Sequence, residues 1–455
     1  MTELPDMLCK GEASRLFPVL SENSKEGRTL SIFLACLENV SAFGRTLLGG
    51  LGVRIGARGK IDTFTEVEFK KSPGDKKDRP DGLIIVKTGK NVWTALVEAK
   101  VGNAVLTNEQ IESYLNLAKA NGIDAVITLS NQFTPLPTHH PLSISPALTR
   151  KVDLFHWSWG HVITQAQLLR DQDEVEDREQ LILLSELQRF LLHHSSGVKE
   201  FDQLPTAWSD LCSTVAAGGR IGVRDPKCQE VVGGWHQALD RMTSMLSRQI
   251  GDHVKVAMAA GETHDPVKRQ KGALADLSGT ACLKSDIIVP DAAAKVQVSA
   301  DLQKRVLAFQ MRLKAPGDRQ STKARLRWLL NQLADADPNE LHIRLAWPGS
   351  SPATQYTLAA LRDDPALASR DRPDMAPHAF DILLVRELGA RFAQPRNFVA
   401  ELLNAAAHFY DNVAFYLAAW QARPGKIAGE KREPASVSTE ALRDQVEQEA
   451  LQRTG

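Results

Sequence analysis

Residues 81–100 read DGLIIVKTGKNVWTALVEAK, and this stretch decides the expected fold. Two short apolar runs flank the segment 88–91 (TGKN), which is typical of a tight turn between antiparallel strands. A turn with Gly89 and Lys90 at its tip places Asp81 directly opposite Glu98 on the neighbouring strand. The stretch therefore predicts a hairpin with two facing carboxylates at its open end.

The facing carboxylates of Asp81 and Glu98 predict a site for a divalent cation. Like charges opposite each other destabilise a sheet, and apolar neighbours raise that cost by removing water. Mg²⁺ binds carboxylate oxygens and waters, so it would remove the conflict. Period two places Lys100 on the face of Glu98, with Ala99 turned away and its carbonyl near the metal. The spacing fits equally well an ordinary hairpin with a surface salt bridge between Glu98 and Lys100.

The segments around the hairpin predict a sheet covered by helices. Apolar residues at helical spacing indicate one long helix over 29–51 and an amphipathic helix over 107–121. Alternation over 63–69 and the apolar run 124–130 indicate two further strands. Because both faces of the hairpin are apolar, helices have to cover the sheet on both sides. The fold class we expect is α/β.

The motifs around the hairpin resemble the PD-(D/E)xK nuclease superfamily. Pro80-Asp81 and the triplet Glu98-Ala99-Lys100 have the order that this superfamily shows, and Gln110 and Tyr114 match the QxxxY element of its RecB-like members. The resemblance covers residues 29–130. It implies a restriction-endonuclease-like fold, in which helices sandwich a mixed sheet, and a nuclease that hydrolyses phosphodiester bonds.

The resemblance also implies a cofactor and a role for each motif residue. The cofactor is Mg²⁺ or Mn²⁺, bound by Asp81, Glu98 and the carbonyl of Ala99. Lys100 would serve the hydrolytic water. The glutamine and the tyrosine of the QxxxY element would support the site or touch nucleic acid.

A third acidic ligand is expected from the N-terminal side of the hairpin. Many RecB-like members carry a histidine there, but no histidine precedes His139 in this chain, so that part of the pattern is not met. Glu66 is the first choice, because it lies on the expected strand before the hairpin, where Phe64, Glu66 and Glu68 would share one face. Glu68 and Glu26, which stands at the start of the first helix, are its rivals.

Gln110 and Tyr114 each have a second interpretation. Thr107-x-x-Gln110 is also a capping box, in which the glutamine side chain would bond the backbone at the start of its helix. Tyr114 lies one turn later on the same helix face, where a core tyrosine with its hydroxyl at the rim is equally consistent.

The charge balance excludes a strong overall positive field, because 55 basic residues cancel 55 acidic ones. Contact with nucleic acid therefore needs a local patch, and basic residues do gather before the hairpin, although a solvated loop would look the same. We expect DNA as the partner ahead of RNA. An RNase with the same site and a catalytically silent binding module of the same fold are the alternatives. The patch consists of Arg54, Arg58, Lys60, Lys70, Lys71, Lys76, Lys77 and Arg79.

The length of 455 residues predicts two or three domains. We expect a nuclease domain with a helical extension over 1–195, a linker over 196–233, a separate α+β domain of unknown role over 234–424, and a charged tail over 425–455. The α+β domain leaves open a homo-oligomer or a regulatory partner. Scattered cysteines and the lack of a long apolar span indicate a cytoplasmic protein that does not contact membranes.

Within the expected α+β domain, apolar patterns predict three strand regions and two helices. These are a hairpin of 295–302 and 305–313, strands over 342–347 and 380–385, and helices over 322–333 and 396–420.

Overall fold

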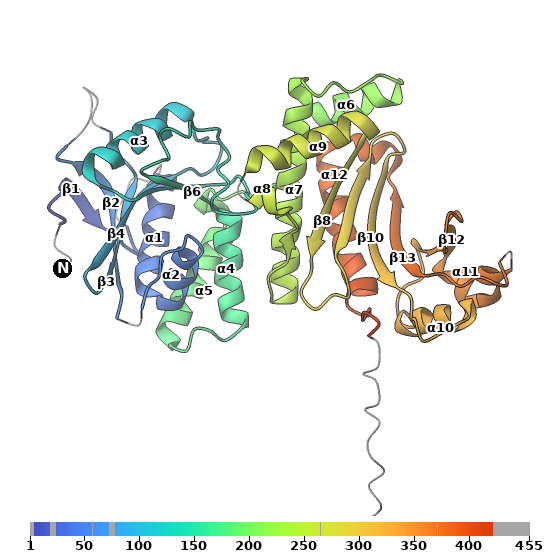
Figure 1. The fold of residues 1–455 in the computed structure, drawn as a ribbon. Coiled ribbons are helices and arrows are strands. Elements are labelled where there is room, and N and C mark those ends of the chain that lie inside the picture. The colour runs from blue at the N-terminus through green and yellow to red at the C-terminus, as the bar shows by residue number, and fades with distance from the viewer. Residues whose placement is uncertain are drawn as a thin grey trace, which may run out of the picture.

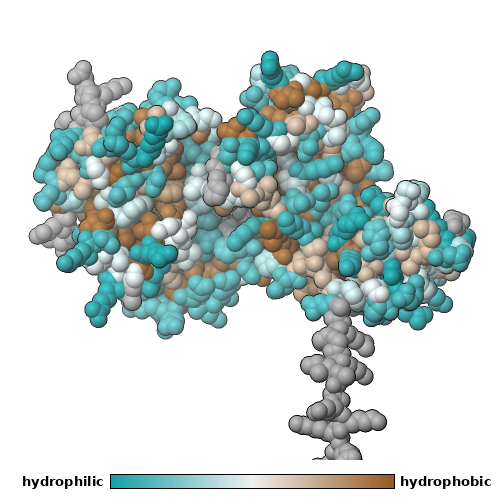
Figure 2. Space-filling view, in the orientation of Figure 1, coloured by the Kyte–Doolittle hydropathy of each residue, from teal (hydrophilic) through white to brown (hydrophobic). Residues whose placement is uncertain are grey.

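The computed structural model of the chain describes residues 4–18, 24–56, 58–71, 78–263, 265–370 and 372–421. It is a mixed α/β structure with two sheets, one in the N-terminal half and one in the C-terminal half, each with its own helices (Figure 1). Figure 2 shows hydrophilic residues spread over both halves on the face in view.

The N-terminal sheet has six strands in chain order, β1-β2-β3-β4-β5-β6, and it is mixed. The first four strands pair antiparallel, whereas β5 lies parallel to both β4 and β6. The parallel pairs are joined through α3 and through the loop that follows β5. The strands are β1 (Leu8–Ala13), β2 (Lys60–Phe69), β3 (Gly82–Thr88), β4 (Asn91–Ala99), β5 (Ala125–Ser130) and β6 (Asp153–Ser158).

The predicted hairpin and its register are confirmed. Strands β3 and β4 pair from Thr88 opposite Asn91 at the turn to Gly82 opposite Val97 at the open end. Asp81 and Glu98 follow next in this register, and the Asp81 Oδ2 atom accepts a hydrogen bond from the backbone N–H of Ala99 at 2.9 Å. The turn residue Gly89 has φ +63°, a conformation that glycine adopts without steric cost.

The predicted alternation along β2 is wrong, because the strand contains a bulge at Glu66. Glu66 has φ +51°, and its N–H bonds the carbonyl of Asp81. Phe64 and Val67 consequently pack into the same apolar cluster although they are three residues apart. On both sides of the bulge, β2 pairs with β1, a strand that the sequence patterns did not predict.

Helices cover the N-terminal sheet on both faces, each over its own apolar cluster. The predicted single helix over 29–51 is wrong, because Val40 is extended and the chain bends by 103° there. Gly44 allows this bend, since a Cβ atom there would lie 2.5 Å from the Leu37 carbonyl oxygen. One face carries α1 (Lys25–Asn39), α2 (Ser41–Gly49), α4 (Trp159–Asp171) and α5 (Arg178–Leu192), and the other carries α3 (Asn108–Asn121).

The C-terminal sheet is antiparallel, with seven strands in the order β12-β11-β13-β10-β9-β8-β7. The predicted hairpin of 295–302 and 305–313 is present as β9 and β10. The strands are β7 (Lys255–Val256), β8 (Cys282–Ile288), β9 (Val296–Asp301), β10 (Val306–Lys314), β11 (Leu341–Ala346), β12 (Thr354–Thr357) and β13 (Ala379–Glu387).

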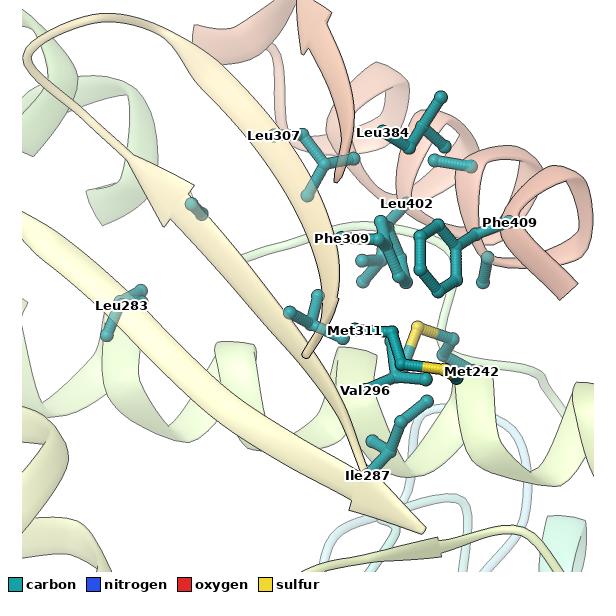
Figure 3. Close-up of a cluster of buried hydrophobic side chains, with 14 of the residues drawn as sticks. Met242, Leu283, Ile287, Val296, Leu307, Phe309, Met311, Leu384, Leu402 and Phe409 are labelled. Carbon is teal, nitrogen blue, oxygen red and sulfur yellow. The ribbon is translucent and has the colours of Figure 1, made fainter. Parts of the chain in front are cut away.

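Helices pack on one face of this second sheet around a single large apolar core. Figure 3 shows part of it, where Met242 of α7, Phe309 of β10 and Phe409 of α12 meet. The helices around this core are α6 (Ala207–Ala216), α7 (Pro226–Ile250), α9 (Pro266–Thr280), α10 (Thr322–Gln332), α11 (Leu358–Asp363) and α12 (Pro395–Phe409), whereas the short helix α8 (Ala260–Thr263) has no buried residue and contacts α9.

The segment predicted as a linker, 196–233, contains α6 and the first turns of α7, and both contribute to the C-terminal core. Helix α7 also packs against α4 of the N-terminal half (Figure 1). The predicted tail, 425–455, lies outside the described residues. In the described part of the chain, no single helix is long and apolar enough to cross a membrane; the bent pair of α1 and α2 passes by length and composition, and it packs into the N-terminal core.

Candidate metal and active site

Three carboxylates meet where β4 ends and α1 begins. Glu98 is the penultimate residue of β4, Asp81 directly precedes β3, and Glu26 lies in the first turn of α1. One oxygen atom of each of these three side chains lies within 4.8 Å of the others. Convergent carboxylate oxygens are the ligands that Mg²⁺ and Mn²⁺ prefer.

Hydrogen bonds near both ends of α1 set the position of Glu26. Glu38, near the end of α1, accepts hydrogen bonds from the backbone and the hydroxyl of Thr63 at 3.0 and 2.8 Å. Near the start of α1, the Thr29 hydroxyl donates to the carbonyl of Ser196 at 2.8 Å. The partial positive charge at a helix N-terminus also favours a carboxylate in the first turn.

Lys100 lies beside two of the three carboxylates. Its Nζ atom is 2.6 Å from Glu98 Oε1 and 3.0 Å from Glu26 Oε1. Its backbone is fixed on both sides, because the N–H donates to the carbonyl of Leu129 at 2.8 Å and the carbonyl accepts from the Trp159 indole at 2.9 Å. Burial alone would lower the pKa of Lys100, but the charges and hydrogen bonds of the two glutamates raise it above its usual value, so the side chain stays an ammonium.

Glu98 is 1% exposed, and its two oxygens have different surroundings. Oε1 accepts hydrogen bonds from Lys100 and from Gln110 Nε2, both at 2.6 Å. Oε2 is buried and has no hydrogen-bond partner among the described residues. Native proteins pair nearly all buried polar atoms, so an unpaired carboxylate oxygen inside an acidic cluster fits a metal ligand.

Gln110 and Tyr114 contact the site from α3. Gln110 Nε2 donates to Glu98 and also to the Tyr114 hydroxyl at 3.3 Å, and that hydroxyl donates to the carbonyl of Arg79 at 3.2 Å. Thr107 caps the helix by accepting from the Gln110 N–H at 3.3 Å, whereas the glutamine side chain points to Glu98. Burial, and after it the charge of Glu98, raises the pKa of Tyr114, which therefore stays neutral.

The surroundings of Asp81 disfavour the ionised form of its carboxyl group. Burial first, and then the charge of Glu98, raises the pKa of Asp81 well above its usual value, although the Ala99 N–H and the Lys100 ammonium act in the opposite direction. A bound cation would stabilise the ionised form of Asp81 and so lower the pKa of this carboxyl group.

The other predicted acidic ligands lie beside the cluster rather than in it. Glu66 is exposed on the bulge of β2, and its carboxylate is not among the three that converge. Glu68 is buried and forms an ion pair with Arg79 at 2.7 Å. Ala99 is fully buried, and its backbone N–H holds Asp81. Glu26, which was predicted only as a rival to Glu66, is the third carboxylate of the cluster.

A cleft of about 510 Å³ leads to Asp81 and Glu26. Its walls are β1, the start of α1, the β2 bulge and the segment before β3, and three cations, Lys10, Arg15 and Arg79, line it. Of the predicted basic patch, Arg79 is in this cleft, whereas Lys60 pairs with Asp62 at 2.7 Å. Residues 76 and 77 of that patch lie outside the described residues.

Comparison of the chain with protein-family models, with curated proteins and with solved structures gives no match.

Proposed function

We propose that the N-terminal half is a metal-dependent nuclease of the PD-(D/E)xK type with a restriction-endonuclease-like fold, and that DNA is its substrate. The main support for this proposal is the carboxylate cluster. One oxygen atom of each of Glu26, Asp81 and Glu98 lies within 4.8 Å of the others, and the ammonium of Lys100 lies beside them. The unpaired Oε2 atom of Glu98 supports a metal ion at the centre of this cluster.

The three acids would hold Mg²⁺ or Mn²⁺, which supplies a water of lowered pKa and neutralises charge that develops on the phosphate. Lys100 contributes a fixed positive charge next to the attacking water. Gln110, which also donates to the Tyr114 hydroxyl, keeps Glu98 Oε1 in place and leaves Oε2 free of hydrogen bonds among the described residues.

The cleft holds three cations on the approach to Asp81. Lys10 and Arg79 pair with Glu68, and Arg15 pairs with Glu12, so phosphates would compete with these acids for the cations, and such contacts are independent of base sequence. Because attack at phosphorus in this site needs no sugar hydroxyl, RNA is the alternative substrate, and competition between the two nucleic acids separates them.

The direct test is cleavage of plasmid and linear DNA with Mg²⁺ by the full chain. Glu98→Gln removes a ligand charge while keeping the shape of the side chain, so cleavage should fall by about 100-fold or more. Glu109→Gln, an exposed acid on α3, is the matched control and should cleave as the wild type does.

The outcomes are distinct. Equal cleavage by wild type and Glu98→Gln would refute the assigned site. A wild type that cleaves neither DNA nor RNA, and that releases no heat when titrated with Mn²⁺, would indicate a silent binding module in place of an enzyme.

A further inference from the structure

A second cavity, of about 620 Å³, lies at the junction of the two halves. The loop after β5, the segment before α6, and helices α7 and α9 form its walls, and it shares no lining residue with the cleft at the carboxylate cluster. Its volume is in the range of small-molecule sites, and Phe133, Phe201 and Leu204 make much of the wall apolar.

Two oppositely charged side chains in this wall have no hydrogen-bond partners. Asp240 of α7 is 5% exposed, and both of its carboxylate oxygens are buried and unpaired among the described residues. Arg269 of α9 is 9% exposed, and its Nη2 atom is likewise unpaired, 3.9 Å from Asp240 Oδ1. Buried charged groups normally have hydrogen-bond partners, whereas these two groups are held only by their mutual ion pair, so a ligand that hydrogen-bonds their unpaired atoms would stabilise both.

Gly233 of α7 lies on the same wall of the cavity. Gly233 lies inside α7, where glycine is a poor helix former, and it lines the cavity. A Cβ atom there would meet nothing within 4 Å, so packing within the protein does not require glycine. Its neighbour Gly234 differs, because a Cβ atom there would lie 2.4 Å from Pro205. Gly233 keeps the cavity open at the wall that carries Asp240.

We propose that the junction cavity binds a guanine base, with Asp240 and Arg269 reading its polar edge and the apolar wall covering its faces. Guanine presents two adjacent N–H donors, which a carboxylate accepts together, and beside them a carbonyl oxygen, to which arginine donates. Adenine, cytosine and uracil lack two adjacent N–H donor groups of this kind. The carbonyl oxygen of guanine would therefore face the unpaired guanidinium nitrogen of Arg269, and its two N–H groups would face the two unpaired oxygens of Asp240.

Binding involves the contact between the two halves. Gln237 of α7 accepts from the backbone N–H of Phe133 at 2.6 Å and donates to the carbonyl of Phe133 at 2.5 Å. The oxygens of Asp240 have almost no exposed surface, so the base reaches them only when the cavity wall opens, and we place this opening at the contact of Gln237 with Phe133, which line the same cavity.

Isothermal titration of the full chain with guanosine, adenosine and cytidine tests the proposal, in buffer without divalent ions so that the carboxylate cluster does not contribute. We expect saturable one-to-one binding of guanosine, and binding of the other two that is weaker by about tenfold or more. Absence of guanosine binding, or equal binding of adenosine, would overturn the proposal.

Two glycine variants supply the matched control. Gly233→Leu fills the cavity and improves the helix propensity of α7, so it should fold and bind guanosine about tenfold or more weakly. Gly279→Leu places the same side chain at an exposed, open position of α9 outside the cavity and should bind as the wild type does. Equal binding by both variants would contradict the assigned cavity.

Asp240→Asn tests the recognition of the base, because an amide cannot accept both N–H groups. This variant should reduce the preference for guanosine over adenosine.

Competition binding distinguishes a free nucleotide from a nucleic-acid strand as the source of the base. Displacement of guanosine by GMP but not by a guanine-containing single-stranded oligonucleotide assigns the site to a free nucleotide, and the reverse result assigns it to a nucleic-acid strand.

Discussion

At the scale of the residue, the surroundings of Glu98 Oε2 and Asp81 give the candidate site its chemistry. An unpaired buried acceptor costs about 1–3 kcal/mol, and the carboxylate of Asp81 is held near that of Glu98 while burial raises its pKa. Neither feature stabilises the fold. Both are relieved by a cation at the centre of the cluster, so the metal-free site is expected to be a destabilising element of the structure.

This cost leads to a prediction for Asp81→Asn. The amide oxygen can still accept the hydrogen bond from the Ala99 N–H, while one of three crowded negative charges is removed. In metal-free buffer the melting temperature of the variant should therefore exceed that of the wild type. Mg²⁺ should raise the melting temperature of the wild type much more than that of the variant, as thermal unfolding by circular dichroism would measure. A variant less stable than the wild type in both buffers would speak against crowding of charge.

A second prediction separates Glu26 from Glu66. Glu26→Gln should lower Mg²⁺-dependent cleavage by about 100-fold, because it removes one of the three converging carboxylates. Glu66→Gln should reduce it by only a few-fold, since this side chain lies on the exposed bulge at the cleft. The rates come from single-turnover cleavage at saturating Mg²⁺. A larger loss of cleavage in Glu66→Gln than in Glu26→Gln would identify Glu66 as the third ligand instead.

The sequence was sufficient to bring Asp81, Glu98 and Lys100 together, because a tight turn and period two are local properties of the chain. It was not sufficient to choose Glu26, because that choice depends on where α1 lies over the sheet, which is a matter of tertiary packing. The one local signal for Glu26 was its place at the start of an expected helix.

At the scale of the element, the β2 bulge explains why the alternation prediction failed. Glu66 adopts φ +51°, a conformation that a non-glycine residue rarely shows and that the sequence pattern does not mark. The bulge lies beside Asp81, whose carbonyl accepts a hydrogen bond from the Glu66 N–H, and β1 pairs with β2 on both sides of it. Bulges of this kind are common next to active sites, where they redirect side chains.

Gly82, at the first position of β3, gives an element-scale prediction. A Cβ atom there would lie 2.9 Å from Leu34 Cδ1 of α1 and 3.1 Å from the Phe64 carbonyl oxygen of β2. Gly82→Ala should therefore separate α1 from the sheet and destabilise the protein by about 1–3 kcal/mol in urea unfolding. Cleavage should fall as well, because Asp81 is the adjacent residue.

Gly49→Ala is the control for this substitution. A Cβ atom at Gly49, in the last turn of α2, would meet nothing within 4 Å, so stability should be unchanged or slightly higher. If Gly82→Ala were as stable and as active as this control, the close approach of α1 to β3 would be refuted.

At the scale of the whole molecule, the elements around the two predicted hairpins were predictable, whereas several other strands and the junction were not. The strands β2 to β5 and β9 to β11 follow from periodicity along the chain, but β1, β6, β7, β8 and β12 were not predicted. The segment over 196–233 has a loose pattern in sequence, yet it supplies α6 and the start of α7, and α7 then packs against α4. Contacts such as that of Gln237 with Phe133 join residues far apart in the sequence, so local patterns do not indicate them.

Buried histidines predict how stability depends on pH. Burial lowers the pKa of His140 to about 4 and that of His156 to about 3, below the usual value of 6.5 that applies to the unfolded chain. The unfolded state therefore binds more protons below about pH 6.5, so stability present above that pH is lost as the pH falls toward 4 and then 3. Urea unfolding should show a lower free energy at about pH 5 than at about pH 7.5.

A pair of variants assigns this pH dependence. His156→Gln should make it weaker, because one buried titrating ring is removed. His194→Gln, at an exposed position, should leave it unchanged. An equal pH dependence in both variants would show that His156 does not contribute.

The most direct test of the proposed metal site is a crystal structure of the full chain soaked in Mn²⁺, with the metal located by anomalous scattering. We expect a peak bounded by the carboxylates of Glu26, Asp81 and Glu98, with Glu98 Oε2 as a ligand and Lys100 beside it. A Mn²⁺ ion bound elsewhere while these three carboxylates remain without metal, or no ordered Mn²⁺ at all, would contradict it.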